Sequence, residues 1–178
     1  MTGIDALLAN AERYTETFRA GGLAIPPARE LAVVACMDAR LDLFDILGLE
    51  KGDAHLIRNA GGTVTPDVRR SLAVSQRRLH TRDIMLIHHT DCGMLTFTDD
   101  EFRAEVYEDV GLTPDYAVDS FTDLEDDVRQ SALRIRADRA IPHRDRIQGF
   151  VYDVKTGRLH PVWIPPHTAG PGADEPIG

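Results

Sequence analysis

The sequence predicts an α/β protein with a mostly parallel central sheet flanked by helices. Between residues 31 and 89, short apolar runs alternate with segments of helical character, which is typical of parallel strands joined by right-handed crossovers. Near the end of the chain, two apolar arms flank a Lys-Thr-Gly-Arg turn, which indicates a β-hairpin and an antiparallel edge strand. A length of 178 residues with 43% hydrophobic content is enough for a sizeable core.

The first predicted element is a helix over residues 4–18, where apolar side chains recur on one face at helical spacing. The pairs Gly21-Gly22 and Pro26-Pro27 then interrupt that pattern. A helix tethered in this way must dock on its own domain or on a neighbouring subunit.

Three apolar runs are predicted to be strands, at residues 31–35, 54–58 and 83–88. The run at 31–35 is apolar throughout, which indicates a strand buried on both faces. A short helix is expected at 42–49 and a longer one at 66–79, where a proline suits the first turn.

The second half of the chain predicts two more helices, at 98–108 and 122–138. The hairpin arms are expected at 150–154 and 159–163. Pro161 in the second arm suits an edge strand only, because proline has no backbone N–H and cannot complete the hydrogen bonds of a central strand.

Residues 1–164 are expected to form a single domain, and the Pro- and Gly-rich segment 165–178 a disordered tail. A net charge of −9 disfavours nucleic acid as a partner, because phosphate binding needs a basic face. The start of the chain has no secretory signal, and no apolar run is long enough to cross a membrane, so we expect a cytoplasmic protein.

Cys36 and Cys92 are the only cysteines, and each lies in a short polar motif. The first motif is Cys-Met-Asp-Ala-Arg, which runs to Arg40, and the second is His-Thr-Asp-Cys, which begins at His89. Both follow predicted strands, and the carboxyl ends of parallel strands share one edge of a sheet. Two thiolates, an imidazole and a carboxylate are donors that zinc prefers. The sequence therefore predicts a Zn²⁺ site formed by Cys36, Asp38, His89 and Cys92.

Simpler interpretations remain open for these motifs. Cys36 and Cys92 could form a disulfide, although a cytoplasmic location favours free thiols. The first motif alone could be a buried thiol beside a surface ion pair, and the second a core histidine beside a structural thiol. His88 is expected to point away from the metal, because adjacent residues of a strand face opposite sides of the sheet.

A zinc site of this composition suggests hydrolytic or hydration chemistry. The fourth position can hold Asp38 or a water, and zinc lowers the pKa of bound water towards ~7. Arg40 is expected to keep Asp38 ionised, so that the pair accepts a hydrogen bond from zinc-bound hydroxide and orients it.

At these residues the chain resembles the β-class carbonic anhydrases, and in particular a compact bacterial branch found in actinobacteria. That family carries Cys-x-Asp-x-Arg, here beginning at Cys36, and His-x-x-Cys-Gly, here ending at Gly93. The Arg-Asn-Ala-Gly segment at 58–61 and the Phe-Val-Tyr-Asp-Val segment at 150–154 also resemble family segments. The resemblance implies a substrate pocket at Arg58, Asn59, Ala60, Gly61 and Gly93.

The resemblance implies reversible hydration of CO₂ to bicarbonate and a proton. It implies zinc held by Cys36, His89 and Cys92, with Asp38 as the fourth ligand in closed forms and the Asp38–Arg40 dyad as catalytic residues. It also implies a homodimer, or a dimer of dimers, in which the N-terminal helix packs on the partner subunit.

Two positions depart from the more familiar family pattern. Ala39 replaces a serine, so a hydroxyl hydrogen bond from that position is lost. Val33 stands where some members have a tryptophan that lines a non-catalytic bicarbonate pocket, so no such inhibitory pocket is expected near Val33 and Arg58.

Two other functions are compatible with the same motifs. Carbonyl sulfide is linear and electrophilic like CO₂, so the protein could be a carbonyl sulfide hydrolase that uses this zinc site. A non-catalytic zinc or redox sensor would use the two thiolates alone, and it would have no need of the Asp38–Arg40 dyad.

Overall fold

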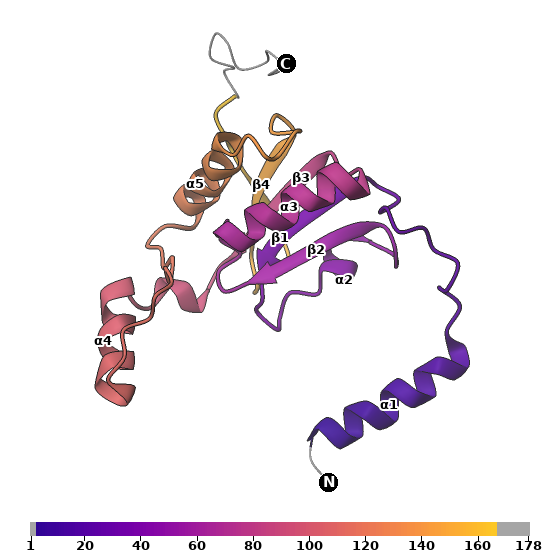
Figure 1. Ribbon diagram of the computed structural model, residues 1–178, viewed down its shortest axis with the longest axis horizontal. Coiled ribbons are helices and arrows are strands. Elements are labelled where there is room, and N and C mark those ends of the chain that lie inside the picture. The colour runs from indigo at the N-terminus through magenta and orange to yellow at the C-terminus, as the bar shows by residue number, and fades with distance from the viewer. Residues whose placement is uncertain (1–2, 167–178) are drawn as a thin grey trace.

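A computed structural model describes residues 3–166, and within them five strands form one sheet in the order β2-β1-β3-β4-β5 (Figure 1). The first four strands in this order run parallel, and β5 is antiparallel to β4. The strands are β1 (Leu31–Cys36), β2 (Ala54–Asn59), β3 (Asp83–His89), β4 (Ile147–Tyr152) and β5 (Leu159–Val162). The predicted mostly parallel α/β fold with an antiparallel edge strand is confirmed.

The helices fall into those that cover the sheet and those that stand apart from it. They are α1 (Gly3–Thr17), α2 (Leu43–Leu47), α3 (Pro66–Leu79), the 3₁₀ turn η1 (Gly93–Leu95), α4 (Asp99–Val110) and α5 (Leu124–Ala137). In Figure 1, α1 and α4 both project away from the sheet, and neither contains a buried residue. In the described part of the chain, no helix is both long and apolar enough to cross a bilayer.

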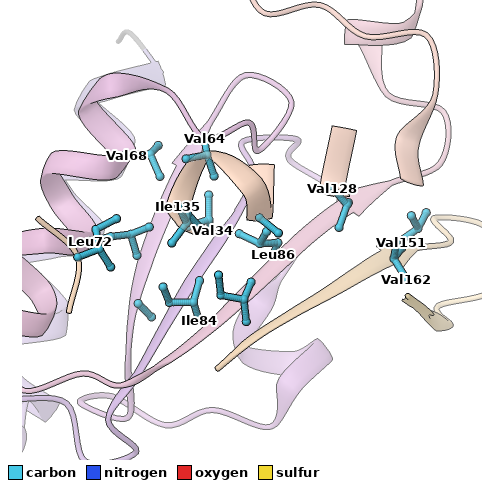
Figure 2. Close-up of a cluster of buried hydrophobic side chains, with 14 residues drawn as sticks. Val34, Val64, Val68, Leu72, Ile84, Leu86, Val128, Ile135, Val151 and Val162 are labelled. Carbon is cyan, nitrogen blue, oxygen red and sulfur yellow. The ribbon is translucent and has the colours of Figure 1, made fainter. Parts of the chain in front are cut away.

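Strand β1 is covered on both faces, as its unbroken apolar run predicts. Ala32 and Val34 face the larger core cluster, which α3 and α5 complete, and Figure 2 shows Val34 among these side chains. Val33 and Ala35 face the other way, towards Leu43 of α2. All four strand residues have no exposed surface. Burial on this scale makes β1 the rigid centre from which the site is built.

Local signals set the helix ends. Thr65 caps α3 by accepting a hydrogen bond from the Val68 N–H, with proline in the first turn. Asp42 caps α2, and Gly48 ends it with φ +61°, a conformation that favours glycine. In α4, Thr98 and Glu101 form a reciprocal capping box.

Strand β4 begins at Ile147, earlier than the arm predicted at 150–154. The residues missed include Gly149, where an added Cβ would lie 2.3 Å from Cγ1 of Val128 on α5. Glycine here permits close packing of α5 on the sheet rather than a turn. The strand ends before Asp153, whose carboxylate accepts hydrogen bonds from Lys155 and Thr156 N–H groups and so starts the hairpin turn.

The predicted tail at 165–178 lies mostly outside the described residues, which end at 166. Within the described part, the Pro165 carbonyl accepts a hydrogen bond from Arg136 on α5. The chain therefore stays in contact with the domain at the start of that segment.

Candidate active site

Three side chains from the two motifs meet at the carboxyl edge of the sheet. Cys36 is the last residue of β1 and His89 the last of β3, which are paired parallel strands, while Cys92 follows in the next turn. Their donor atoms lie within 4.8 Å of one another, and the two Sγ atoms are 4.0 Å apart. All three residues are buried, so they form an enclosed group of metal-type donors.

The geometry of this group fits a tetrahedral dication. Both cysteines are free, and their sulfur atoms are well beyond the ~2.05 Å of a disulfide bond. Zn–S bonds of about 2.3 Å in a tetrahedron place two sulfur atoms about 3.8 Å apart. His89 Nδ1 lies 2.9 Å from the Thr90 carbonyl, while buried Nε2 has no hydrogen-bond partner. An Nδ1–H that donates to this carbonyl leaves the Nε2 lone pair for a metal.

Electrostatics favour one thiolate before any cation binds. The hydrogen bond with Cys92 outweighs burial and lowers the pKa of Cys36 well below the usual value of a thiol. The same hydrogen bond, followed by burial, raises the pKa of Cys92. Burial alone would lower the pKa of His89, but the nearby Cys36 thiolate raises it overall. A second thiolate beside the first needs a compensating positive charge, which a divalent metal supplies.

Asp38 lies beside this group and is fully engaged by Arg40. Its Oδ1 accepts hydrogen bonds from the backbone N–H and the Nε–H of Arg40, both at 2.9 Å, and its Oδ2 accepts from Nη2 at 2.7 Å. These bonds hold the pKa of the Asp38 carboxyl well below its usual range. Oδ2 also lies 3.7 Å from His89 Nε2. The structure therefore brings Asp38 next to the three donors, with both of its oxygens on Arg40.

Two supporting contacts were not visible in the sequence. Arg40 Nη1 also donates to Asp91 Oδ2 at 2.8 Å, which links the two motif loops. Arg58 donates from Nε to the Cys36 carbonyl at 3.0 Å and from Nη2 to the Asp38 carbonyl at 2.6 Å. These partners are distant along the chain, and local periodicity carries no signal for them.

A cavity of about 400 Å³ opens onto the donor group. Of the predicted pocket residues, Ala60, Gly61 and Gly93 line it, together with the apolar side chains of Met94 and Phe97. Arg58 and Asn59 instead line a neighbouring cavity of about 430 Å³. The cavity beside the donors is thus lined largely by small or apolar residues.

The glycine pair after β2 allows the chain to approach the first motif. Gly61 and Gly62 have φ values of +77° and +74°. A Cβ on Gly62 would lie 2.7 Å from the backbone N of Cys36, and a Cβ on Gly61 would lie 2.8 Å from the Phe121 ring. Only glycine fits both the conformation and the space.

His88 points away from the metal donors, as expected because adjacent residues of a strand face opposite sides of the sheet. It is fully buried against α5, where its Nε2 lies 2.7 Å from Asp127 Oδ2. Its ring also packs against the Phe121 ring in a tilted arrangement, with centroids 5.2 Å apart. His88 therefore ties the end of β3 to α5 and takes no part in the donor group.

Comparison with known proteins identifies the family. The model of a family described as carbonic anhydrase matches residues 31–131. Beta-carbonic anhydrase 1 of Mycobacterium tuberculosis is 51% identical over 162 residues, covering 91% of this chain and 99% of that protein. A carbon disulfide hydrolase of Acidianus sp. is 35% identical, covering 88% of this chain and 87% of that protein.

Solved structures agree with the sequence relatives. The carbonic anhydrase from Streptococcus mutans has a TM-score of 0.85 at 40% identity, covering 91% of this chain and 98% of that one. Carbonic anhydrase from Glaciozyma antarctica has a TM-score of 0.79 at 38% identity, with coverages of 88% and 95%. Sequence, fold and donor geometry agree, and the chain belongs to the β-class carbonic anhydrase family.

Proposed function

We propose that this protein catalyses the reversible hydration of CO₂ to bicarbonate and a proton, with Zn²⁺ as its metal. The observation that carries the proposal is the convergence of Cys36, His89 and Cys92 beside the Asp38–Arg40 pair. A structural zinc site usually has four protein ligands, whereas a catalytic one typically has three and leaves the fourth position to water or substrate.

The residues of the site have two roles, which are to bind the metal and to orient the nucleophile. Two cysteine thiolates would neutralise the dication, and His89 would add a neutral third bond through Nε2. Bound Zn²⁺ supplies the nucleophile by lowering the pKa of a coordinated water towards ~7. Asp38 Oδ2 lies 3.7 Å from His89 Nε2 and, held ionised by Arg40, would accept a hydrogen bond that orients the nucleophile.

The cavity beside the donors suits a small, linear, apolar substrate. Met94 and Phe97 offer apolar surface, and Ala60 and Gly61 have little or no side chain to obstruct entry. CO₂ held against this wall would lie next to the nucleophile that Asp38 orients. Proximity of this kind removes much of the entropic cost of the reaction.

The direct test is stopped-flow CO₂ hydration by the purified protein, with zinc measured on the same sample. We expect about one Zn²⁺ per chain and activity that depends on it. The Cys36→Ser variant should lose zinc and activity together. A zinc-loaded protein that does not accelerate CO₂ hydration would reject the proposal.

A second candidate is hydrolysis of CS₂ or carbonyl sulfide at the same site. The similarity to carbon disulfide hydrolases supports it, although these relatives are only 31–35% identical, against 51% for beta-carbonic anhydrase 1. Turnover of CO₂ and carbonyl sulfide should be compared on one preparation. A strong preference for carbonyl sulfide would favour this second function.

We also propose that the chain forms a dimer, or a dimer of dimers, through α1. This helix has no buried residue, and Ile4, Leu7 and Leu8 are 67%, 70% and 60% exposed. Apolar surface of this kind marks an interface. Tyr14 of this helix accepts a hydrogen bond from Lys51 of the domain, which is a polar contact. We place the protein in the cytoplasm, because its two cysteines are free.

A further inference from the structure

Arg40 is held by acidic residues from two separate loops. Its Nε and Nη2 donate to the two carboxylate oxygens of Asp38, at 2.9 and 2.7 Å. On the opposite side, Nη1 donates to Asp91 Oδ2 at 2.8 Å, and Nη2 donates to the Asp91 backbone carbonyl at 2.9 Å. The guanidinium therefore bridges the loop after β1 and the loop after β3.

Asp91 does not have the position of a catalytic or packing residue. Its side chain is 68% exposed and it does not line the cavity at the metal donors. Its backbone has φ +58°, a conformation that aspartate tolerates better than most residues. What its side chain does provide is a charged acceptor for Arg40, the residue that holds Asp38.

Without the Asp91 carboxylate, Nη1 of Arg40 would lose the one acceptor it has among the described residues. The Arg40 side chain is 46% exposed, and a long exposed side chain loses conformational entropy when one ion pair must hold it. With Asp91 in place, the guanidinium is held by two loops at once. The orientation of Asp38 towards the metal donors then depends on a prearranged partner.

We propose that Asp91 is a positioning residue of this enzyme, which acts on the reaction only through Arg40. It keeps the guanidinium in place, and the guanidinium keeps the Asp38 carboxylate directed at the nucleophile. The proposal rests on the proposed function, because it assigns Asp91 a part in the same hydration reaction.

The test compares Asp91→Gly, which suits the positive φ and removes the carboxylate, with Asp91→Asn, which suits it and keeps an acceptor oxygen. Asp126→Ala is the matched control, since Asp126 is 72% exposed and is also one of two acidic partners of an arginine, Arg129. We expect Asp91→Gly to lower kcat/KM about two- to fivefold, the range for loss of an exposed ion pair. Asp91→Asn should recover most of this loss, and Asp126→Ala should match the unsubstituted protein.

Two further readouts separate positioning from a general structural effect. In an Arg40→Ala background, Asp91→Gly should cause no additional loss of kcat/KM, because its route to the reaction is already gone. In metal-free protein, the Arg40 Nε–H should exchange with solvent several-fold faster in Asp91→Gly, as measured by ¹⁵N NMR.

Equal losses with and without Arg40, or unchanged Nε–H exchange in Asp91→Gly, would overturn the proposal. Failure of the proposed function is distinguishable from this result. If the unsubstituted protein does not hydrate CO₂, the hydration reaction is wrong, while the exchange measurement still decides whether Asp91 fixes Arg40.

Discussion

The Arg58 side chain reaches from β2 to the end of β1 and the loop that follows it. It donates hydrogen bonds to backbone carbonyls there. Its two hydrogen bonds end on the carbonyls of Cys36 and Asp38, two residues of the first motif. The position of a metal-binding side chain depends on how firmly its backbone is held. Arg58 thus supports the donor loop although it does not line the cavity at the donors.

Replacing Arg58 by Met should loosen this loop. Two hydrogen bonds are lost while the apolar stem is kept, so we expect the free energy of unfolding of the metal-free protein to fall by about 1–3 kcal/mol. Urea unfolding measures the change, and zinc affinity should fall with it. Arg70→Met is the control, since exposed Arg70 pairs only with nearby Asp67 in the described structure. Equal effects of the two substitutions would count against a special role for Arg58.

The donor residues themselves were accessible to sequence reasoning, and their supports were not. Cys36 and His89 end two apolar strands, and parallel strands bring such ends together. The Arg40–Asp91 and Arg58–Cys36 contacts join residues 51 and 22 positions apart. Side-chain contacts over such separations depend on rotamers and loop conformations that residue type alone does not specify.

At the scale of elements, the chain after α4 is tied back to the helix by one carboxylate. Asp99 Oδ1 accepts hydrogen bonds from the N–H and the hydroxyl of Ser120, at 2.9 and 2.6 Å. Oδ2 accepts from the N–H of Asp119, which has φ +58°. These bonds fix the segment that places Phe121 against Met94 and Gly61 near the site.

The Asp99 contacts predict a pH-dependent stability. The hydrogen bonds from Ser120 lower the pKa of Asp99 below its usual value. A lowered folded-state pKa gives stability that is present above the unfolded pKa of about 3.9 and is lost as pH falls through the folded value.

Asp99→Asn should therefore lower the free energy of unfolding at pH 7 by about 1 kcal/mol, because the charge on the acceptor is lost. The difference from the unsubstituted protein should shrink below about pH 4. Denaturant unfolding at several pH values measures it. A difference that does not change with pH would contradict this role for the charge.

Element positions followed from sequence where burial or capping dominates. Strand β1 has an unbroken apolar run because both faces are covered, and α3 has its threonine cap and proline. The start of β4 was missed because glycine and glutamine are weak strand residues. At Gly149 the approach of α5 decides the structure, and that approach is a tertiary effect.

At the scale of the whole molecule, α1 is not packed against the sheet of its own chain. The helix projects from the domain with its apolar side chains exposed (Figure 1). The helix includes both acidic and basic residues, so a surplus of one charge does not explain why it projects from the domain. A second copy of the chain would cover this surface, in keeping with the proposed dimer.

Replacing both Leu7 and Leu8 by Asp should shift the protein towards monomer, because each charge would have to be buried in the interface. Light scattering after size exclusion measures the mass of each variant. Glu12→Gln on the same helix is the control and should leave the mass unchanged. An unsubstituted protein that is already monomeric at micromolar concentration would contradict the proposed assembly.

The proposed chemistry requires that Cys36, His89 and Cys92 hold one zinc ion in the folded protein. Zinc K-edge X-ray absorption of the purified, unsubstituted chain tests it most directly. The spectrum should show two sulfur neighbours at about 2.3 Å and at least one nitrogen neighbour at about 2.0 Å. A zinc shell with only nitrogen and oxygen neighbours, or protein purified without chelators that contains no zinc, would contradict it.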